Sequence, residues 1–562
     1  MKVTLPILSV FVAISTLFGD DVEASPLLEK RAVKAKLNVD PGTYEGAGTS
    51  GVAVMHMVLT APNRLVFIDK VNKNPLKQKN GDPAISTEFD IGKKTQRVLD
   101  LKTNTFCSAG AFTSDGTLVH TGGTGAEQNT QHKDGFQSIR LFKPCQNKKC
   151  QWTENVNGLS TKRWYPSMVS LSDGRVLILG GSTKATGINN ADINNPTFEF
   201  FPSKKSTPKP FPFLQETLPR NLYPVVHLLS GPANQKRLFV FADVKSIVWD
   251  WEANKIVKRL PNLPGPSRSY PFTGTSVILP LRPEKNYASR VMVCGGGKGT
   301  NFNTVADNTC GTIDLSDLNK ADWKMEDFGG FPRIMPDGVI LADGKVMYLN
   351  GAGKGIAGYI ADNPSTTPVL YDPEAKAGQR FTSLKNAGIA RMYHSVATLL
   401  PNGKVFISGS NPNQFVKNDK KLKFPTEYRN QIYTPPYFFK DVPGHKITSV
   451  AGKTLLNKDT AILVKFNQVV KVLVETTTTD VNFTGALVHF GFVTHSTHMS
   501  QRYVATKIKK TSLISNAAKK VFALDVEMPP NGNMMPPGRH HYLYINNKGV
   551  PAATAIEINL QK

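Results

Sequence analysis

The fold is decided by one stretch of sequence, Asp173-Gly-Arg-Val-Leu-Ile-Leu-Gly-Gly181, because the chain repeats its pattern. The stretch combines an Asp-Gly turn, a strongly β-forming apolar run and a closing pair of glycines. Asp-Gly and Asn-Gly dipeptides favour the two-residue hairpin turns whose twist matches that of the flanking strands. Comparable β runs start at Arg64, Thr117, Arg175, Arg237, Arg290, Lys345 and Lys404, at steps of 53 to 62 residues. The sequence therefore contains seven copies of one β unit.

Seven β units of this length are typical of a kelch-like β-propeller. A single unit cannot bury both of its faces, so the units close into a ring. Two unrelated β-sandwiches are the alternative, and they would not explain the even spacing. We predict an all-β chain, with a seven-bladed kelch-like β-propeller over residues 45–440. Beyond the Pro-rich segment 425–437, a non-repeating alternation of period two predicts a C-terminal immunoglobulin-like β-sandwich over residues 445–560.

The N-terminus has the order of features found in secretory signals. Lys2 precedes an apolar stretch over residues 5–18 and small residues near Ala24, which predicts a signal peptide over residues 1–24. The pair Lys30-Arg31 predicts the end of a pro-segment over residues 25–31. No later stretch is long and apolar enough to predict a transmembrane helix. We expect a secreted, extracellular monomer that can associate with the cell wall, and a glycosylation site at Asn482.

The formal net charge is +25, from 68 Lys and Arg against 43 Asp and Glu. Such an excess indicates an anionic partner. The lysines are scattered, with only short runs such as Lys420-Lys421-Leu422-Lys423, whereas nucleic-acid binding favours clusters in an arm, helix or finger. We therefore expect no nucleic-acid partner. In a secreted protein, an anionic extracellular polysaccharide fits the charge better.

The chain has five cysteines, and cysteines of secreted proteins usually pair. Cys145 and Cys150 can close a tight loop, and Cys294 and Cys310 flank a Gly-rich segment, so we expect these two disulfides. Cys107 is left over. It is a buried inert thiol, an intermolecular link or part of a reactive site.

Equivalent positions of several repeats carry reactive side chains. The residue nine positions before the hairpin glycine is Cys107, Tyr165 or His394 in three repeats. Tyr393 precedes His394, and Tyr223 and Tyr270, each followed by proline, fall at the corresponding place in two further repeats. Because inner strands surround the axis of a propeller, these side chains are expected to converge near one mouth of the channel.

The second domain adds His495 and His498, three residues apart. Imidazole nitrogens combined with phenolate oxygens suit Cu(II), whereas zinc would be expected with more Cys or carboxylate ligands. The sequence contains no phosphate-binding Gly-rich loop and no HExxH zinc motif. The pattern therefore favours a copper site over nucleotide or metalloprotease chemistry.

These residues resemble those of the extracellular copper radical oxidases, the family of galactose oxidase and glyoxal oxidase. The resemblance covers nearly the whole chain after residue 31. It rests on Phe106-Cys107, Arg163-Trp-Tyr165, Met392-Tyr-His394-Ser395, the linker 425–437, and Thr494-His495 followed by Gln501-Arg502. Tyr-His-Ser alone is common, but the ordered set of four such motifs, each on its own repeat or domain, is very specific.

The resemblance implies a site with one copper ion and a protein-derived Tyr–Cys radical cofactor. Tyr165 would be a copper ligand joined to Cys107 by a thioether, and the linked phenol would hold the radical. Tyr393 would be the axial phenolate ligand and the base. His394 and His495 would be the imidazole ligands. His498 matches no ligand and is interpreted as lying behind the site or at the surface.

The implied reaction is oxidation of a small aldehyde, such as glyoxal or methylglyoxal, to a carboxylic acid, with reduction of O₂ to H₂O₂. Thr183 stands where galactose oxidase has a tryptophan that stacks on the thioether, so the glyoxal oxidase branch is the closer likeness. An alcohol or galactose-type oxidase and a non-enzymatic glycan-binding propeller are the alternatives. Tyr223, Tyr270 and Arg333 are our candidates for the substrate rim.

Overall fold

The computed structural model describes residues 42–562 except 146–148, 189, 203–206, 420 and 455–460. The expected signal peptide and pro-segment lie outside these residues. The described chain is nearly all β, and α1 (Phe213–Glu216) is a single turn. Among the described residues, no helix is long and apolar enough to cross a bilayer.

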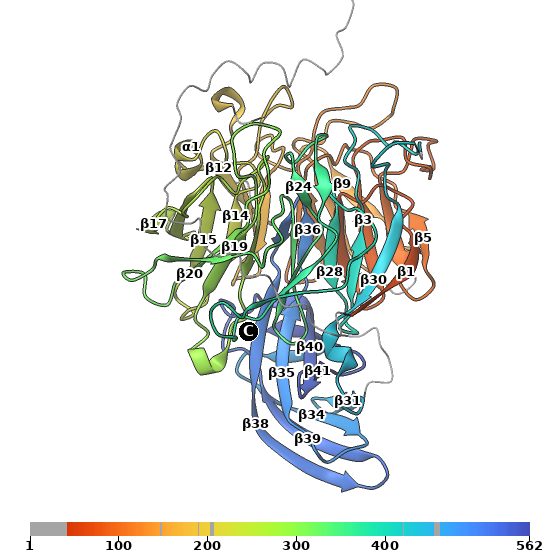
Figure 1. Ribbon diagram of the computed structural model, residues 1–562, viewed down its shortest axis with the longest axis vertical. Helices are drawn as coiled ribbons and strands as arrows, with labels where there is room; N and C mark the ends of the chain where they lie inside the picture. Colours follow the sequence, from red (N-terminus) through yellow and green to blue (C-terminus); the bar gives the residue numbers. More distant parts are fainter. Residues whose placement is uncertain (1–41, 146–148, 189, 203–206, 420, 455–460) are drawn as a thin grey trace, which may run out of the picture.

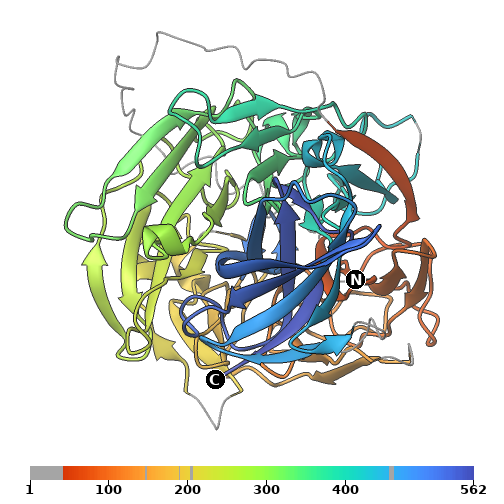
Figure 2. The ribbon, with the colours of Figure 1, turned by 90° about the horizontal axis from the view of Figure 1, so that it is seen from below.

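Seven β-sheets surround a central axis and form the predicted propeller (Figures 1 and 2). The first three blades are β2–β5 (His56–Ala61, Arg64–Ile68, Ser86–Asp90, Thr95–Val98), β6–β9 (Ala109–Phe112, Leu118–Thr121, Ile139–Phe142, Trp152–Asn155) and β10–β13 (Ser167–Ser170, Val176–Leu179, Thr197–Phe201, Lys209–Pro210). The next two are β14–β17 (Val225–Leu228, Arg237–Ala242, Lys245–Asp250, Lys255–Arg259) and β18–β21 (Thr275–Ile278, Arg290–Cys294, Thr309–Asp314, Trp323–Asp327). The sixth comprises β22, β23, β26 and β27 (Asp337–Ile340, Val346–Leu349, Val369–Tyr371, Phe381–Ser383), and the last comprises β28, β29, β30 and β1 (Val396–Leu399, Val405–Ser408, Arg429–Thr434, Thr43–Thr49).

The burial of each strand depends on its distance from the axis. The first strand of a blade lies innermost, and β6, β10 and β28 are buried at every residue. The outer strand β17 alternates between exposed and half-buried residues, and Lys255 and Arg259 are among its exposed residues. This gradient explains how scattered lysines and a large apolar core coexist in one chain.

The ring is closed by strands from opposite ends of the propeller sequence. The N-terminal strand β1 pairs antiparallel with β30, so Thr43 lies opposite Thr434. The N-terminal strand thereby becomes the outer edge of the last blade. Because the closing blade contains both ends, the ring cannot open without losing this ladder of hydrogen bonds.

The β-sandwich lies against one face of the propeller, over the centre of the ring (Figure 2). Its strands are β31–β35 (His445–Val450, Lys453–Thr454, Ile462–Lys465, Val469–Thr476, Phe483–His489) and β38–β42 (Arg502–Asn516, Lys520–Glu527, Gly538–Asn547, Val550–Pro551, Ile556–Gln561). Its apolar core includes Val472, Leu524 and Leu543 and continues into Ile278 and Leu281 of the propeller. The shared core fixes one domain against the other.

A hairpin of the sandwich enters the propeller along its axis (Figure 1). It consists of β36 (Phe492–Thr494) and β37 (Thr497–Met499), and β36 pairs with the inner strand β2. His495 lies in the turn between the two strands. The hairpin therefore carries a histidine of the second domain into the ring formed by the first.

The two predicted disulfides are present. Cys145 pairs with Cys150, and Cys294 pairs with Cys310 on the neighbouring strands β19 and β20. Cys107 is a buried free cysteine.

Candidate metal centre

Several candidate residues share an unusual backbone conformation at the start of an inner strand. Cys107, Tyr165, Tyr223 and His394 each lie two residues before the inner strand of their blade, with φ of 54°, 61°, 47° and 63°. Bulky residues rarely adopt positive φ, and each instance costs about 1–3 kcal/mol. Adjacent blades are also linked here, because the Tyr165 amide donates to the Cys107 carbonyl over 2.8 Å. The fold holds these residues in a strained conformation around the axis.

Two imidazoles and a thiol form the centre of the site. His394 Nε2 lies 3.2 Å from His495 Nε2, and Cys107 Sγ lies 3.3 Å from the same His495 atom. The three ligand atoms lie within 4.8 Å of one another, and all three residues are buried. One metal ion can therefore reach all three donor atoms.

A hydroxyl group sets the tautomer of His495. The Thr494 hydroxyl donates to the Met55 carbonyl over 3.1 Å and lies 2.6 Å from His495 Nδ1. Because this hydroxyl donates its own proton to the Met55 carbonyl, it accepts a hydrogen bond from the Nδ1–H group of His495. The lone pair of His495 then remains on Nε2, where a metal ligand needs it.

Two phenols adjoin the imidazoles and are connected by a third. The Tyr270 hydroxyl lies 3.0 Å from the Tyr165 hydroxyl and 3.3 Å from the Tyr393 hydroxyl. The Tyr393 ring stacks on the His394 ring at 3.7 Å between centroids. The Tyr165 and Tyr393 rings thus lie beside the imidazoles, 6.0 and 5.5 Å from the His495 ring between centroids.

Burial keeps these donors uncharged without a metal ion. It raises the pKa of Tyr165, Tyr393 and Cys107 above their usual values. It also lowers the pKa of His394 and brings that of His495 to about 3. Neutral imidazole is the form that binds metals, and a cation here would favour ionised phenols. Two imidazole nitrogens with phenolic oxygens fit one copper ion.

Cys107 and Tyr165 are in contact beneath a cover of aromatic rings. The Tyr165 amide donates to the Cys107 carbonyl, and the Tyr165 side chain is close enough to influence the pKa of the Cys107 thiol. The Trp164 and Tyr270 rings lie 4.4 and 4.6 Å from the Tyr165 ring. Thr183 stands at the position from which a covering tryptophan was expected, and Trp164, which the sequence analysis did not single out, lies beside the Tyr165 ring instead. The signal was its position in Arg-Trp-Tyr, directly before the candidate ligand.

A cavity of about 520 Å³ opens onto Tyr165, Tyr270 and Tyr393. Most of its wall is apolar, and Lys70 and Glu127 are its charged residues. The other lining residues are Val71, Asn104, Phe106, Thr124, Trp164, Ala185, Ile188, Phe302, Ile356, Gly358, Tyr359, Ile360, Gln414 and Phe415. An apolar cavity with a few convergent polar groups is the usual form of a small-molecule site.

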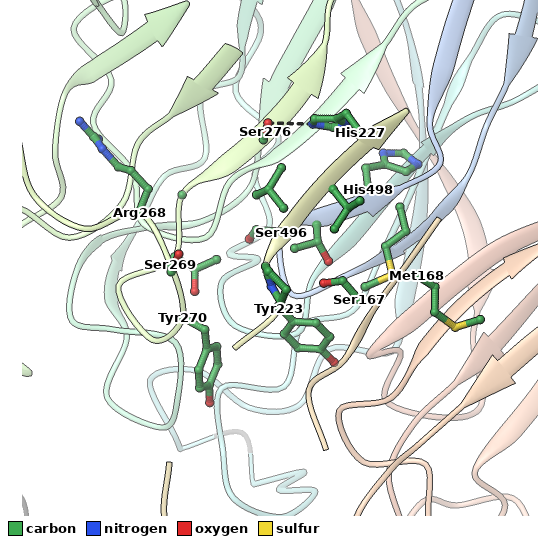
Figure 3. Close-up of a pocket in the computed structure, with 17 residues that line it drawn as sticks. Ser167, Met168, Tyr223, His227, Arg268, Ser269, Tyr270, Ser276, Ser496 and His498 are labelled. Atoms are coloured by element: carbon green, nitrogen blue, oxygen red, sulfur yellow. Dashed lines mark hydrogen bonds between the residues drawn. The ribbon is translucent and has the colours of Figure 1, made fainter. Parts of the chain in front are cut away.

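Of the three rim candidates, Tyr270 alone lines this cavity. Tyr223 lies behind the centre, where its ring is 4.9 Å from the His495 ring and its hydroxyl donates to the Ser108 carbonyl over 2.9 Å. It lines a separate, water-sized cavity of about 30 Å³ (Figure 3). His498 is buried against the same small cavity and stands outside the metal cluster.

The prediction that Arg333 lies at the substrate rim is wrong. Its side chain is fully buried and donates to the carbonyls of Asn350 and Thr367, within its own blade. Arg163 and Arg391 do the same in theirs, to Gly180 and Arg429 among others. An arginine just before the inner strand is therefore a repeated blade clamp. Its recurrence in the sequence was the signal for this role.

Asn482 is exposed, as a glycosylation site requires. Glycosylation at this residue stays a prediction.

Comparisons with known proteins identify the family of this chain. A family model described as "Glyoxal oxidase N-terminus" matches residues 55–437, and one described as "Galactose oxidase-like, Early set domain" matches residues 446–558. A relative from Vitis pseudoreticulata named "Aldehyde oxidase GLOX" is 33% identical over 545 residues, covering 91% of this chain and 96% of that protein. "Aldehyde oxidase GLOX1" from Arabidopsis thaliana is 30% identical over 553 residues, covering 91% and 83%.

A solved structure, a fungal alcohol oxidase of the AA5 family in complex with copper, has a similar fold. Its TM-score is 0.67 at 16% sequence identity, and the alignment covers 93% of this chain and all of that one. At this identity the similarity concerns the fold alone.

Proposed function

The chain belongs to the glyoxal oxidase family. We propose that it is a secreted oxidase of small aldehydes such as glyoxal and methylglyoxal. Family membership makes it an oxidoreductase of the copper radical oxidase type. In the proposed reaction a hydrated aldehyde, RCH(OH)₂, and O₂ become RCOOH and H₂O₂. The observation that carries the proposal is the buried cluster of Cys107, His394 and His495 beside two phenols at the floor of a cavity.

We assign four ligands to one copper ion: Tyr165, Tyr393, His394 and His495. When bound, copper would supply one-electron redox chemistry at the cavity floor, and a Cys107–Tyr165 thioether would supply a second one-electron site. Forming this bond removes the thiol hydrogen and one ring hydrogen, and O₂, the oxidant of the proposed reaction, would take up both as H₂O₂. The contact between the two side chains and the rings that cover them support the assignment.

The protein's own groups handle the protons and exclude water. Tyr393 lines the cavity, and its oxygen, when ionised, can accept a proton from a substrate bound there. The Tyr270 hydroxyl contacts both ligand phenols, so it holds a proton between their oxygens. Trp164, Phe106 and Tyr359 form apolar walls around the substrate. In such a dry site, electrostatic interactions with the reacting atoms are stronger than in water.

A substrate panel on copper-loaded, oxidant-treated protein tests the proposal. A peroxidase-coupled assay should detect H₂O₂ with glyoxal and methylglyoxal, and zinc-loaded protein should give none. Tyr393→Phe, which keeps the ring but removes the oxygen, is the matched control and should be inactive. Peroxide from alcohols or galactose but no aldehyde would favour the alternative activity. No peroxide from any of these substrates would overturn the proposal.

Secretion and retention outside the cell belong to the same proposal. Two disulfides and exposed lysines on outer strands support an extracellular protein that binds anionic polysaccharide. Secreted protein should begin after residue 24 or after Arg31 and behave as a monomer in light scattering. Binding to a polyanionic glycan matrix should weaken as salt increases. Salt-independent elution would refute the electrostatic part.

A further inference from the structure

A lysine lies buried in the wall of the cavity above the metal centre. Lys70 follows β3 and is 5% exposed. Its ammonium donates to the Gln414 carbonyl and lies 3.4 Å from the Tyr359 hydroxyl. It also lies over the rings of Phe106, Tyr359 and Phe415, at 4.8, 5.4 and 5.6 Å from their centroids.

All of these partners are neutral. Burying an ammonium is costly, and a carbonyl, a hydroxyl and three ring faces compensate for only part of the lost hydration. Burial accordingly lowers the pKa of Lys70. Two carboxylates are near: Asp69 accepts a hydrogen bond from Asn74 over 2.7 Å, and Glu127 lies on the cavity wall and is half-buried. The Lys70 ammonium is thus a buried cation on the cavity wall, and an anion bound in the cavity would compensate for its lost hydration.

The ammonium and the metal centre face the same cavity. The Phe106 ring beneath Lys70 lies 6.3 Å from the His394 ring, and the Tyr359 ring lies 6.2 Å from the Tyr393 ring. A small molecule on Tyr393 therefore lies within the field of this cation.

We infer that Lys70 binds the non-reacting end of the substrate and selects small aldehydes that carry a carboxylate next to the carbonyl carbon. The inference rests on the proposed function and names a specificity-determining residue for it. An ammonium is a point charge that suits a carboxylate, and the desolvated cavity strengthens the attraction.

Binding to metal-free protein tests the inference without turnover. The probe is oxamate, which carries a carboxylate and an amide, and its neutral counterpart is oxamide. In calorimetry, the wild type should bind oxamate at least tenfold more tightly than oxamide. Lys70→Met keeps the apolar stem and should lose this preference, whereas Lys70→Arg keeps the charge and should retain most of it. Glu127→Gln should not weaken oxamate binding.

Kinetics of the copper-loaded enzyme give a second readout. In Lys70→Met, the ratio of kcat/KM for glyoxylate to that for methylglyoxal should fall at least tenfold. A purely structural lysine would lower both values equally, together with the melting temperature, and that result would overturn the inference. Unchanged oxamate binding in Lys70→Met would also overturn it. Charge-dependent oxamate binding without oxidation of any aldehyde would contradict the proposed function but support this subsite.

Discussion

Replacing Thr494 by valine tests how the fold prepares His495 for a metal. Valine has the shape of threonine, so the buried site stays filled, but the hydroxyl between His495 Nδ1 and the Met55 carbonyl is lost. A buried polar group without a partner costs about 1–3 kcal/mol. Loss of such a supporting group typically weakens metal binding by about 10- to 100-fold. We therefore expect Thr494→Val to lower copper affinity by this factor and the unfolding free energy by about 1–3 kcal/mol.

Copper affinity is measured by competition with a chromophoric chelator at pH 7, and stability by urea unfolding of the metal-free protein. The matched control is Thr497→Val in the same hairpin, whose hydroxyl donates to the Thr494 carbonyl instead of bonding to His495 Nδ1. The control should keep wild-type copper affinity. Wild-type affinity in Thr494→Val, within threefold, would refute the role of the hydroxyl in holding the tautomer.

Three further predictions concern stability. Arg333→Met should lower Tm without changing KM, because the buried guanidinium clamps its blade; a changed KM with unchanged Tm would restore a role at the rim. Burial lowers the pKa of His489 and of His498 from 6.5 to about 4, so between these pH values the unfolded chain binds more protons. Urea unfolding should show stability falling as pH drops through this window, by about 1.4 kcal/mol per pH unit for each histidine, and His498→Gln should make the slope shallower. Replacing both Cys294 and Cys310 by alanine should cost about 2–4 kcal/mol in the same assay, and an unchanged midpoint would contradict this.

Much of the propeller could be predicted because its information is local. Each repeat carries its own turn dipeptide and β run, and aligning the turns placed Cys107, Tyr165 and His394 at equivalent positions. The shared position is also a shared conformation, because each of the three has positive φ before its inner strand. In these blades, the same position in the repeat therefore leads to the same place beside the propeller axis.

The other features depend on contacts between distant segments. His495 reaches the axis only because β36 pairs with β2, more than 400 residues away in sequence. Lys70 becomes a cavity residue through contacts with Gln414 and Tyr359. The prediction for Arg333 failed for a different reason. We expected this charged residue at a blade edge to contact the substrate, but its partners are carbonyl groups of its own blade.

Mass mapping of the protein after copper treatment in air shows directly whether Cys107 and Tyr165 form one redox cofactor. Trypsin should release the two residues in segments 103–133 and 164–175. We predict that, after reduction, these segments remain joined and weigh two hydrogen atoms less than their sum. Metal-free protein and the Cys107→Ser variant should give separate segments. If the copper-treated wild type also gives separate segments of ordinary mass, the claim is contradicted.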